Sequence, residues 1–396
     1  MNGTLTIRNA RVFHGETDAL VAQDLFLVNG AVADAPADGA PELDAAGRVV
    51  IPGLIDAHFH AYAVGMGGLD DERGPLSYTA LNGAKRLKNA LLRGFTSVRD
   101  VAGGDQGLAR AVTTGLIDSP RYLFTGPALS QTGGHGDPRP ADLDVCFSHG
   151  HMVSVVDGVD PLRVAVRERL RTGAHAIKIM TSGGVVSLTD PIRIPQYSAE
   201  EVRVVVEEAT RRGSYVAAHA YSPEAIRHSL ENGVRSIEHG NLLDADTATL
   251  MAEHDAILVP TLAAYDAMNR RGDEVNMNPI SRAKNDEVLQ AGKEAIRLAL
   301  AAGVRVGFGS DLMGDLEDEQ LVGVRLQEEA VGAQATMRSM TRVNAELIGD
   351  ERAGRLTPGA HADLVILDTE DLTDLSAIWD AARPRTVVRG GVPISV

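Results

Sequence analysis

The sequence predicts a mixed α/β protein in which a (β/α)8 barrel, the TIM-barrel fold, is inserted in a small β-sandwich domain formed by both chain termini. Two observations carry this prediction. Short apolar segments alternate with long amphipathic segments through the middle of the chain, and strand-like segments recur at both ends. Such alternation is typical of parallel βαβ units, eight of which can close into a barrel. The predicted boundaries are 1–52 and 353–396 for the sandwich and 53–352 for the barrel.

Eight short apolar segments are the candidate barrel strands. Each is a few residues long and is bounded by Gly, Pro or charged residues, as buried parallel strands commonly are. Their spacing leaves room for helices between them. The segments are VIPGLIDAHFH (50–60), FTSVRD (95–100), RYLFTGP (121–127), AIKIMTS (176–182), YVAAHAY (215–221), SIEHGN (236–241), AILVPTL (256–262) and RVGFGSD (305–311).

The segments between these strands have helical periodicity. Apolar residues recur at helical spacing in YTALNGAKRLKNALLRG, DPLRVAVRERLRTGA and SAEEVRVVVEEATRRG. The last of these begins with Ser198, and Glu201 follows three residues on, which is a capping-box signature. Gly213 is the type of residue that ends a helix. Because residues 264–303 are long for one connection, we expect an additional helix or a loop over the site there.

Strand-like segments also flank the predicted barrel. Two of them, TLTIRNARVF and DLFLVNGAVA, lie in the first fifty residues. GRLTPGAHADLVILD (354–368) and TVVRGGVPISV (386–396) follow the barrel. The simplest arrangement joins both ends in one small β domain. The length of 396 residues suits a barrel of about 250 residues with an accessory domain.

Composition argues against several classes of protein. The formal net charge of −16 repels nucleic acid backbones and anionic membranes, so we expect neither as a partner. No apolar run approaches the ~20 residues that span a bilayer, and the first residues lack the pattern of a signal peptide. The single cysteine, Cys146, permits no intrachain disulfide and is interpreted as a small apolar residue rather than a nucleophile. We therefore expect a cytoplasmic protein that acts on a small molecule.

Metal-ligand residue types lie at the ends of the predicted strands, where (β/α)8 barrels carry their functional residues. His58 and His60 end the first strand, and both face the interior because residues i and i+2 point to the same side. His219, His239 and Asp311 end the fifth, sixth and eighth strands. Each has a structural alternative when taken alone: a buried core histidine, or a helix cap in the case of the aspartate. Their convergence on one end of the barrel predicts a metal centre.

Lys178 is the unusual member of this set because it lies in the apolar fourth strand, AIKIM. Burying an ammonium is costly unless its charge is relieved, and a cation would repel a nearby metal. A carbamylated lysine would resolve both problems, because addition of CO2 gives a carboxylate whose two oxygens can each bind one metal. The sequence itself shows only a lysine where an ordinary one is unfavourable.

With these motifs the chain resembles the amidohydrolase superfamily, specifically its binuclear members with a carbamylated lysine. It is most similar to the imidazolonepropionase-related group, which includes prolidase-like dipeptidases, N-acyl-amino-acid hydrolases and ochratoxin-type amidases. Imidazolonepropionase itself differs at the metal site, and Lys178 argues against that reaction. The matching motifs are GLIDAHFH (53–60), IKIMTSGGV (177–185), AAHAYSPEAI (217–226), SIEHGNLLD (236–244), GFGSD (307–311) and GRLTPGAHADLVILD (354–368), with TGGHGD (132–137) and TDPI (189–192) indicating the same group.

The resemblance implies a centre of two divalent metal ions. Zinc is the expected metal, and N/O ligand sets of this type suit it. A carbamylated lysine and a hydroxide would bridge the two ions. The implied ligands are His58, His60 and Asp311 for the more buried ion, His219 and His239 for the more exposed ion, and Lys178 for the bridge.

The resemblance also implies the reaction, which is cleavage of an amide or peptide C–N bond by the metal-bridging hydroxide. The substrate class is a dipeptide, an N-acyl amino acid or an ochratoxin-like amide. Asp311 would take the proton from the hydroxide and pass it to the leaving group. His135 in the GGHG loop and Tyr221 after the fifth strand would contact the substrate and assist catalysis. Arg193 is a candidate partner for a substrate carboxylate. The alternative for both His135, a loop histidine, and Arg193 is a side chain that is only solvated.

Three alternatives stay open. The same centre could hydrolyse a lactone, a carbamate or an organophosphate ester, because the pocket loops decide the substrate. Mononuclear deaminases of the superfamily use a Glu three residues after the fifth-strand His, where this chain has Ser222; the nearest Glu is Glu224. A non-enzymatic metal-dependent scaffold would be recognised by a broken ligand set, and all six positions are intact. Related barrels often assemble through their helical faces, so we expect a homo-oligomer.

Overall fold

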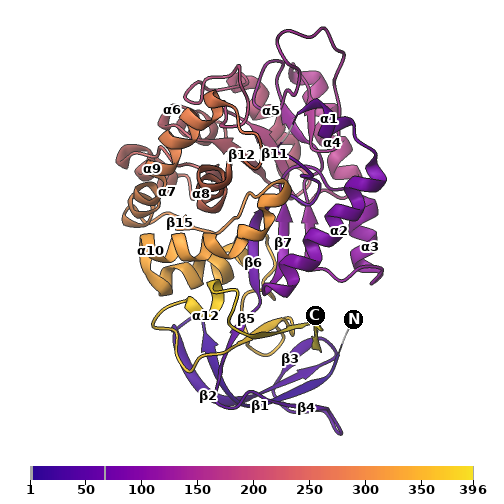
Figure 1. Ribbon diagram of the computed structural model, residues 1–396, viewed down its shortest axis with the longest axis vertical. Coiled ribbons are helices and arrows are strands. Elements are labelled where there is room, and N and C mark those ends of the chain that lie inside the picture. The colour runs from indigo at the N-terminus through magenta and orange to yellow at the C-terminus, as the bar shows by residue number, and fades with distance from the viewer. Residues whose placement is uncertain (1–2, 67, 396) are drawn as a thin grey trace.

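Two parallel β-sheets form the centre of the computed structural model, which describes residues 3–66 and 68–395 (Figure 1). The larger sheet has seven strands in the order β10-β9-β11-β12-β13-β14-β15, and the smaller has the order β6-β7-β8. The strands are β6 (Leu54–Phe59), β7 (Phe95–Asp100), β8 (Arg121–Phe124), β9 (Ala128–Ser130), β10 (Val153–Val155), β11 (Ile177–Met180), β12 (Val216–Ala220), β13 (Ser236–His239), β14 (Ile257–Val259) and β15 (Arg305–Val306).

Backbone hydrogen bonds join the two sheets on both sides. Ala57 of β6 donates to the carbonyl of Phe308, just after β15, at 2.9 Å. His175, just before β11, donates to the carbonyl of Phe124 in β8 at 2.7 Å. The first predicted strand therefore lies beside the last, and the third lies beside the fourth.

All eight predicted strands are present, as β6 to β8 and β11 to β15. The structure adds β9 and β10, which the sequence analysis did not predict. Each has three residues, which is too short to display a period of two. These two strands extend the edge of the larger sheet next to β11.

The helices follow the strands along the chain and cover the outer faces of the two parallel sheets (Figure 1). The predicted capping box is present at α5, where Ser198 Oγ accepts from Glu201 N and the Glu201 side chain accepts from Ser198 N. The additional helix expected within 264–303 is also present, because α8 and α9 both lie there. The helices are α1 (Leu69–Arg73), α2 (Leu76–Leu92), α3 (Gln106–Thr113), α4 (Val159–Arg171), α5 (Ala199–Thr210), α6 (Pro223–Glu231), α7 (Ala245–Glu253), α8 (Leu262–Arg271), α9 (Pro279–Ala301), α10 (Gln320–Arg338), α11 (Asn344–Leu347) and α12 (Ser376–Trp379), with a 3-10 turn at Gly314–Glu319 and a π turn at Ser339–Val343.

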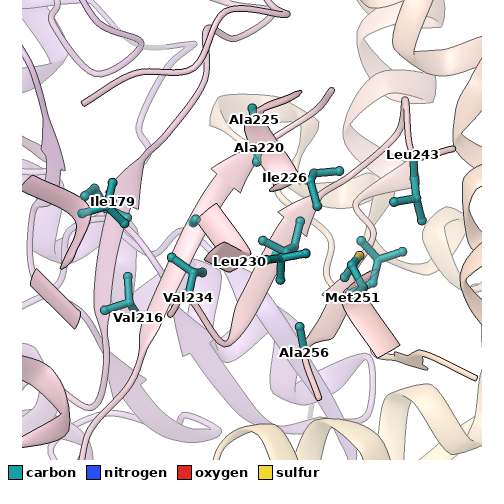
Figure 2. Close-up of a cluster of buried hydrophobic side chains, with 14 of the residues drawn as sticks. Ile179, Val216, Ala220, Ala225, Ile226, Leu230, Val234, Leu243, Met251 and Ala256 are labelled. Atoms are coloured by element: carbon teal, nitrogen blue, oxygen red, sulfur yellow. The ribbon is translucent and has the colours of Figure 1, made fainter. Parts of the chain in front are cut away.

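The largest buried core lies between the seven-stranded sheet and its covering helices (Figure 2). It includes Ile179 of β11, Val216 of β12, Leu230 of α6 and Met251 of α7, all at most 1% exposed. Each such side chain contributes roughly 1.5–3 kcal/mol when it leaves water. This packing stabilises the seven-stranded sheet, whose strands carry several of the candidate site residues.

The alternation of side chains along β11 decides which residues face the other way. Ile177 and Ile179 belong to the buried core. Lys178 and Met180 line a cavity on the opposite side of the strand, because successive side chains of a strand point to opposite faces. The apolar strand β11 thus places Lys178 on its cavity side, in the interior of the molecule.

Both ends of the chain form one further sheet of eight strands, in which β5 pairs antiparallel with β16 (Figure 1). Its order is β18-β17-β16-β5-β1-β2-β3, and β4 pairs with β1. The expectation of a β domain built from both termini is therefore confirmed. Its strands are β1 (Leu5–His14), β2 (Ala19–Val28), β3 (Ala31–Ala33), β4 (Glu42–Asp44), β5 (Val49–Pro52), β16 (Leu364–Leu367), β17 (Arg385–Arg389) and β18 (Val392–Pro393). None of the described helices has the length and apolar character needed to cross a membrane.

Candidate metal centre

A cavity of about 670 Å³ lies where the parallel strands end. Loops that follow β6, β9, β11 and β15 contribute to its wall, together with residues of α8 and α9. Eight of the nine residues predicted for the site line it. These are His58, His60, His135, Lys178, His219, Tyr221, His239 and Asp311.

Three imidazoles surround the Asp311 carboxylate. His60 Nε2 lies 2.9 Å and His58 Nε2 3.3 Å from Asp311 Oδ1. His239 Nδ1 lies 3.6 Å from Asp311 Oδ2. One ligand atom from each of His58, His239 and Asp311 falls within 4.8 Å of the others, so these three residues lie close enough to belong to one metal centre.

The protonation states of these groups suit a metal. Burial lowers the pKa of His60 and lowers that of His239 well below its usual value, so both rings are neutral at pH 7. Burial alone would raise the pKa of Asp311, but His58 and His60 hold it well below its usual range. Neutral rings and an ionised carboxylate therefore lie at close range, and a shared divalent cation would be ligated by ring lone pairs and by the carboxylate together. The residues present fit a metal ion.

Glu238 and Arg99 form a hydrogen-bonded chain behind the Nδ1 nitrogen of His58. Neither residue was predicted from the sequence. His58 Nδ1 donates to Glu238 Oε2 at 2.7 Å, and Arg99 Nη2 donates to Glu238 Oε1 at 2.7 Å. Both side chains are completely buried. Burial alone would raise the pKa of Glu238, but Arg99 keeps it ionised. A carboxylate on one ring nitrogen orients the other toward a metal, so this pair aims His58 Nε2 at Asp311.

The backbone is strained at two of the metal-ligand candidates. His239 has φ of 75° and Asp311 has φ of 54°, in the left-handed region that L-residues rarely occupy. Such conformations persist only where surrounding contacts enforce them, and they cluster at functional sites. His239 is held further by Thr261 Oγ1 and Tyr265 OH, at 2.8 and 2.9 Å from its Nδ1.

Lys178 is 2% exposed and lines the same cavity. Burial lowers its pKa to about 8, against the opposing effect of Glu238 and Asp311. A substantial fraction of the amine is therefore neutral near pH 7 to 8. A neutral amine is the form that can react with CO2.

His135 and Tyr221 lie over the histidine cluster. The His135 ring stacks on His219 with centroids 4.1 Å apart, and the Tyr221 ring stacks on His239 at 5.0 Å. The Tyr221 hydroxyl is 2.8 Å from that of Tyr265. Burial raises the pKa of Tyr221 well above its usual value, so the hydroxyl keeps its proton at neutral pH.

Arg193 does not lie where the sequence analysis expected it. Its exposed guanidinium pairs with Glu287 at 2.7 Å, and it is absent from the described lining of the cavity. Arg139, on the loop after β9, lines the cavity instead and pairs with Asp137 at 2.5 Å. The pattern TDPIRIPQ gave no information on which face of its loop the arginine would occupy.

A cluster of neutral imidazoles, a carboxylate and a buried lysine at the ends of parallel strands defines the class: a metal-dependent hydrolase with an α/β fold. The amidohydrolase family model matches residues 49–394, and the chain belongs to the amidohydrolase family. It is a hydrolase that acts on carbon–nitrogen bonds. The resemblance to the amidohydrolase superfamily is therefore confirmed.

Known proteins similar to this chain include amide and peptide hydrolases. The ochratoxinase of Aspergillus niger is 31% identical over 400 residues, covering 94% of this chain and 82% of that protein. A prolidase complexed with N-methylphosphonate-L-proline has a TM-score of 0.94 and 40% identity, with 99% of both chains covered. A Xaa-Pro dipeptidase with methionine bound in its active site has a TM-score of 0.88 and 25% identity, with 100% of both chains covered.

Proposed function

We propose that this protein hydrolyses an amide or peptide bond of a small molecule at a centre of two divalent metal ions. The observation that carries this proposal is the convergence of neutral imidazoles on the ionised Asp311 carboxylate inside one cavity. The relatives with prolidase or ochratoxinase activity support an amide-type bond.

The proposed ligand set contains six residues, and zinc suits its N/O donors. When bound, the ions lower the pKa of water to about 7 and polarise a carbonyl oxygen. The Lys178 amine would add to CO2, forming an N–C bond and releasing one proton, so that its carboxylate can bridge both ions. We assign His58, His60 and Asp311 to the more buried ion, His219 and His239 to the more exposed ion, and Lys178 to the bridge.

The remaining chemistry belongs to side chains of the cavity. Asp311 would accept the proton of the attacking water and deliver it to the leaving nitrogen. Tyr221, which keeps its hydroxyl proton, would donate a hydrogen bond to the carbonyl oxygen of the substrate. His135 would contact the substrate next to Tyr221. Arg139 replaces Arg193 as the candidate partner for a substrate carboxylate, because Arg139 lines the cavity.

Methionines in the cavity wall favour a substrate with a large apolar group. Thioether side chains adapt to irregular apolar shapes, and the cavity volume falls within the roughly 300–1,000 Å³ typical of sites for drug-sized ligands. An N-acyl amino acid or a dipeptide with a bulky apolar half fits this wall better than a short polar dipeptide. Six of the ten methionines in the chain line the cavity: Met66, Met152, Met180, Met268, Met277 and Met313.

For the architecture, we propose that the two parallel sheets are parts of one closed (β/α)8 barrel spanning residues 53–352. The backbone bonds from β6 to the segment after β15, and from His175, just ahead of β11, to β8, support closure. Residues 1–52 and 353–396 would form the β-sandwich. The single cysteine suits a reducing cytoplasm, and the helical faces suit assembly into a homo-oligomer.

A substrate panel tests the proposed reaction. The zinc-loaded protein would be assayed with N-acyl amino acids that share one amino acid and carry acyl groups from acetyl to naphthoyl, with Xaa-Pro dipeptides, and with ester and lactone analogues. We expect amides with a large apolar group to exceed the acetyl compound in kcat/KM by about tenfold or more, since burying such a group yields roughly 1.5–3 kcal/mol. Cleavage confined to esters or lactones would contradict the proposal.

A further inference from the structure

Lys284 makes an unusual set of contacts from helix α9. Its Nζ donates to the carbonyl oxygens of Gly184, Ser187 and Asp190 at 3.0, 2.8 and 2.8 Å. An ammonium has three N–H donors, so the loop 183–190 after β11 uses the full capacity of this group. The side chain is 16% exposed, and its partners lie about a hundred residues earlier in the chain.

The residues that Lys284 holds form a cradle for His135. Ser187 Oγ lies 2.7 Å from His135 Nδ1. A Cβ on Gly184 would lie 2.0 Å from the His135 ring, so only a glycine leaves room for it. The ring also stacks on His219, with centroids 4.1 Å apart. The imidazole is therefore clamped between the loop and a candidate metal ligand.

The cradle also determines which ring nitrogen is left for a substrate. Ser187 Oγ lies 3.3 Å from the carbonyl of Gly184, to which it donates its proton, so it accepts from His135 Nδ1–H. The Asp190 carboxylate, 3.9 Å from the same nitrogen, favours the proton there. Nδ1 is thus engaged, and Nε2 remains for the substrate.

Asp190 gives a second reason for a cation at this place. Its Oδ2 accepts from the backbone of Gly184 and from Gln196, while its buried Oδ1 has no hydrogen-bond partner within the described residues. Lys284 Nζ lies 3.9 Å from that oxygen. A buried carboxylate without a nearby cation is costly, so the lysine offsets this charge as well as anchoring the loop.

We propose that Lys284 is a positioning residue for the reaction: it fixes the loop 183–190 and, through Gly184, Ser187 and Asp190, the orientation of His135 in the cavity. The proposal rests on the proposed function for the role of His135. By this proposal, the long connection between β14 and β15, which carries α9, helps to build the site. The loop and helix α9 are far apart in the sequence and come into contact only in the folded chain. The spacing of motifs therefore does not reveal this contact.

The test compares Lys284→Met with Lys293→Met in the metal-loaded enzyme. Lys293 lies on the same helix, but its Nζ pairs with Glu329 at the surface, so it is a matched control. We expect Lys284→Met to lower kcat by about 10- to 100-fold, because small displacements of a positioned group cost up to that factor. The change in KM should be smaller, and the metal content should be unchanged. Lys284→Arg, which keeps a cation and several donors, should recover most of kcat.

A double-mutant cycle separates positioning from a general loss of stability. In a His135→Ala background, the Lys284→Met substitution should change kcat less than about twofold, because its effect passes through the imidazole. A loss of kcat by the same factor in both backgrounds would overturn the proposal, and so would an equal loss in Lys293→Met.

Hydrogen exchange makes the proposal testable without turnover. Amides of residues 183–190 should exchange faster in Lys284→Met than in wild type or Lys293→Met, while the rest of the barrel is unchanged. Unchanged exchange in this loop would overturn the anchoring claim. Absence of amide cleavage by the wild-type enzyme, with the exchange difference intact, would instead count against the proposed function and leave Lys284 as an anchor without a catalytic consequence.

Discussion

Asp311→Asn is expected to reduce turnover on the order of 10³-fold while the protein stays folded. The amide keeps the shape of the carboxylate but cannot accept the proton of the attacking water, and general acid–base groups contribute about 10²- to 10⁴-fold. The substitution also removes the negative charge that three imidazoles surround. Steady-state kinetics on the best amide of the panel, with circular dichroism as the check on folding, measures the effect.

Asp315→Asn is the control for this substitution. Asp315 is an exposed aspartate four residues further along the chain, so its amide variant should keep wild-type turnover. If Asp311→Asn retained more than a tenth of wild-type turnover, Asp311 would not be the proton carrier.

Lys178→Ala is expected to remove the proposed bridge of the metal centre. The variant should bind less metal than wild type and lose most activity, and short carboxylic acids such as acetate or propionate should restore part of it by occupying the vacated space. The fold should survive, because alanine suits the buried apolar strand β11. Metal analysis and kinetics with and without the acids measure both effects, with the exposed Lys85→Ala as a control.

The same lysine gives a pH dependence. CO2 adds to the neutral amine only, and burial lowers the pKa of Lys178 to about 8. The neutral fraction therefore rises between pH 6 and pH 8, so metal-free protein should recover activity faster at pH 8 when metal and bicarbonate are supplied. If Lys178→Ala bound as much metal as wild type, the carbamate bridge would be wrong.

The clustering of the candidate ligands was predictable because strand geometry is simple. His58 and His60 share a face through the period of two, and Lys178 faces the interior for the same reason. The ends of parallel strands then bring His219 and His239 together without any knowledge of the loops. Sequence spacing carries this information directly.

The supporting residues were not predictable in the same way. Glu238 stands next to His239, yet it binds His58 of the other parallel sheet. Its need for Arg99 follows from burial that the sequence does not state. A lone arginine within the apolar strand FTSVRD was the available signal. Tyr265 comes from α8, outside the strand ends, so no strand pattern points to it.

The loops gave the weakest information. Arg193 was chosen from a motif, but its loop turns the side chain to Glu287, while Arg139 from another loop enters the cavity. The path of a loop depends on long-range contacts such as those of Lys284, which connect segments far apart in the chain. Local sequence does not encode which of two arginines lines the cavity.

The metal content of the purified protein tests the central claim most directly. Elemental mass spectrometry on protein purified without chelators should find about two divalent ions per chain, as a two-metal hydrolytic centre requires. Removal of the ions by a chelator should abolish amide cleavage, and added zinc should restore it. A protein that holds no metal, with activity that chelators leave untouched, would contradict the account.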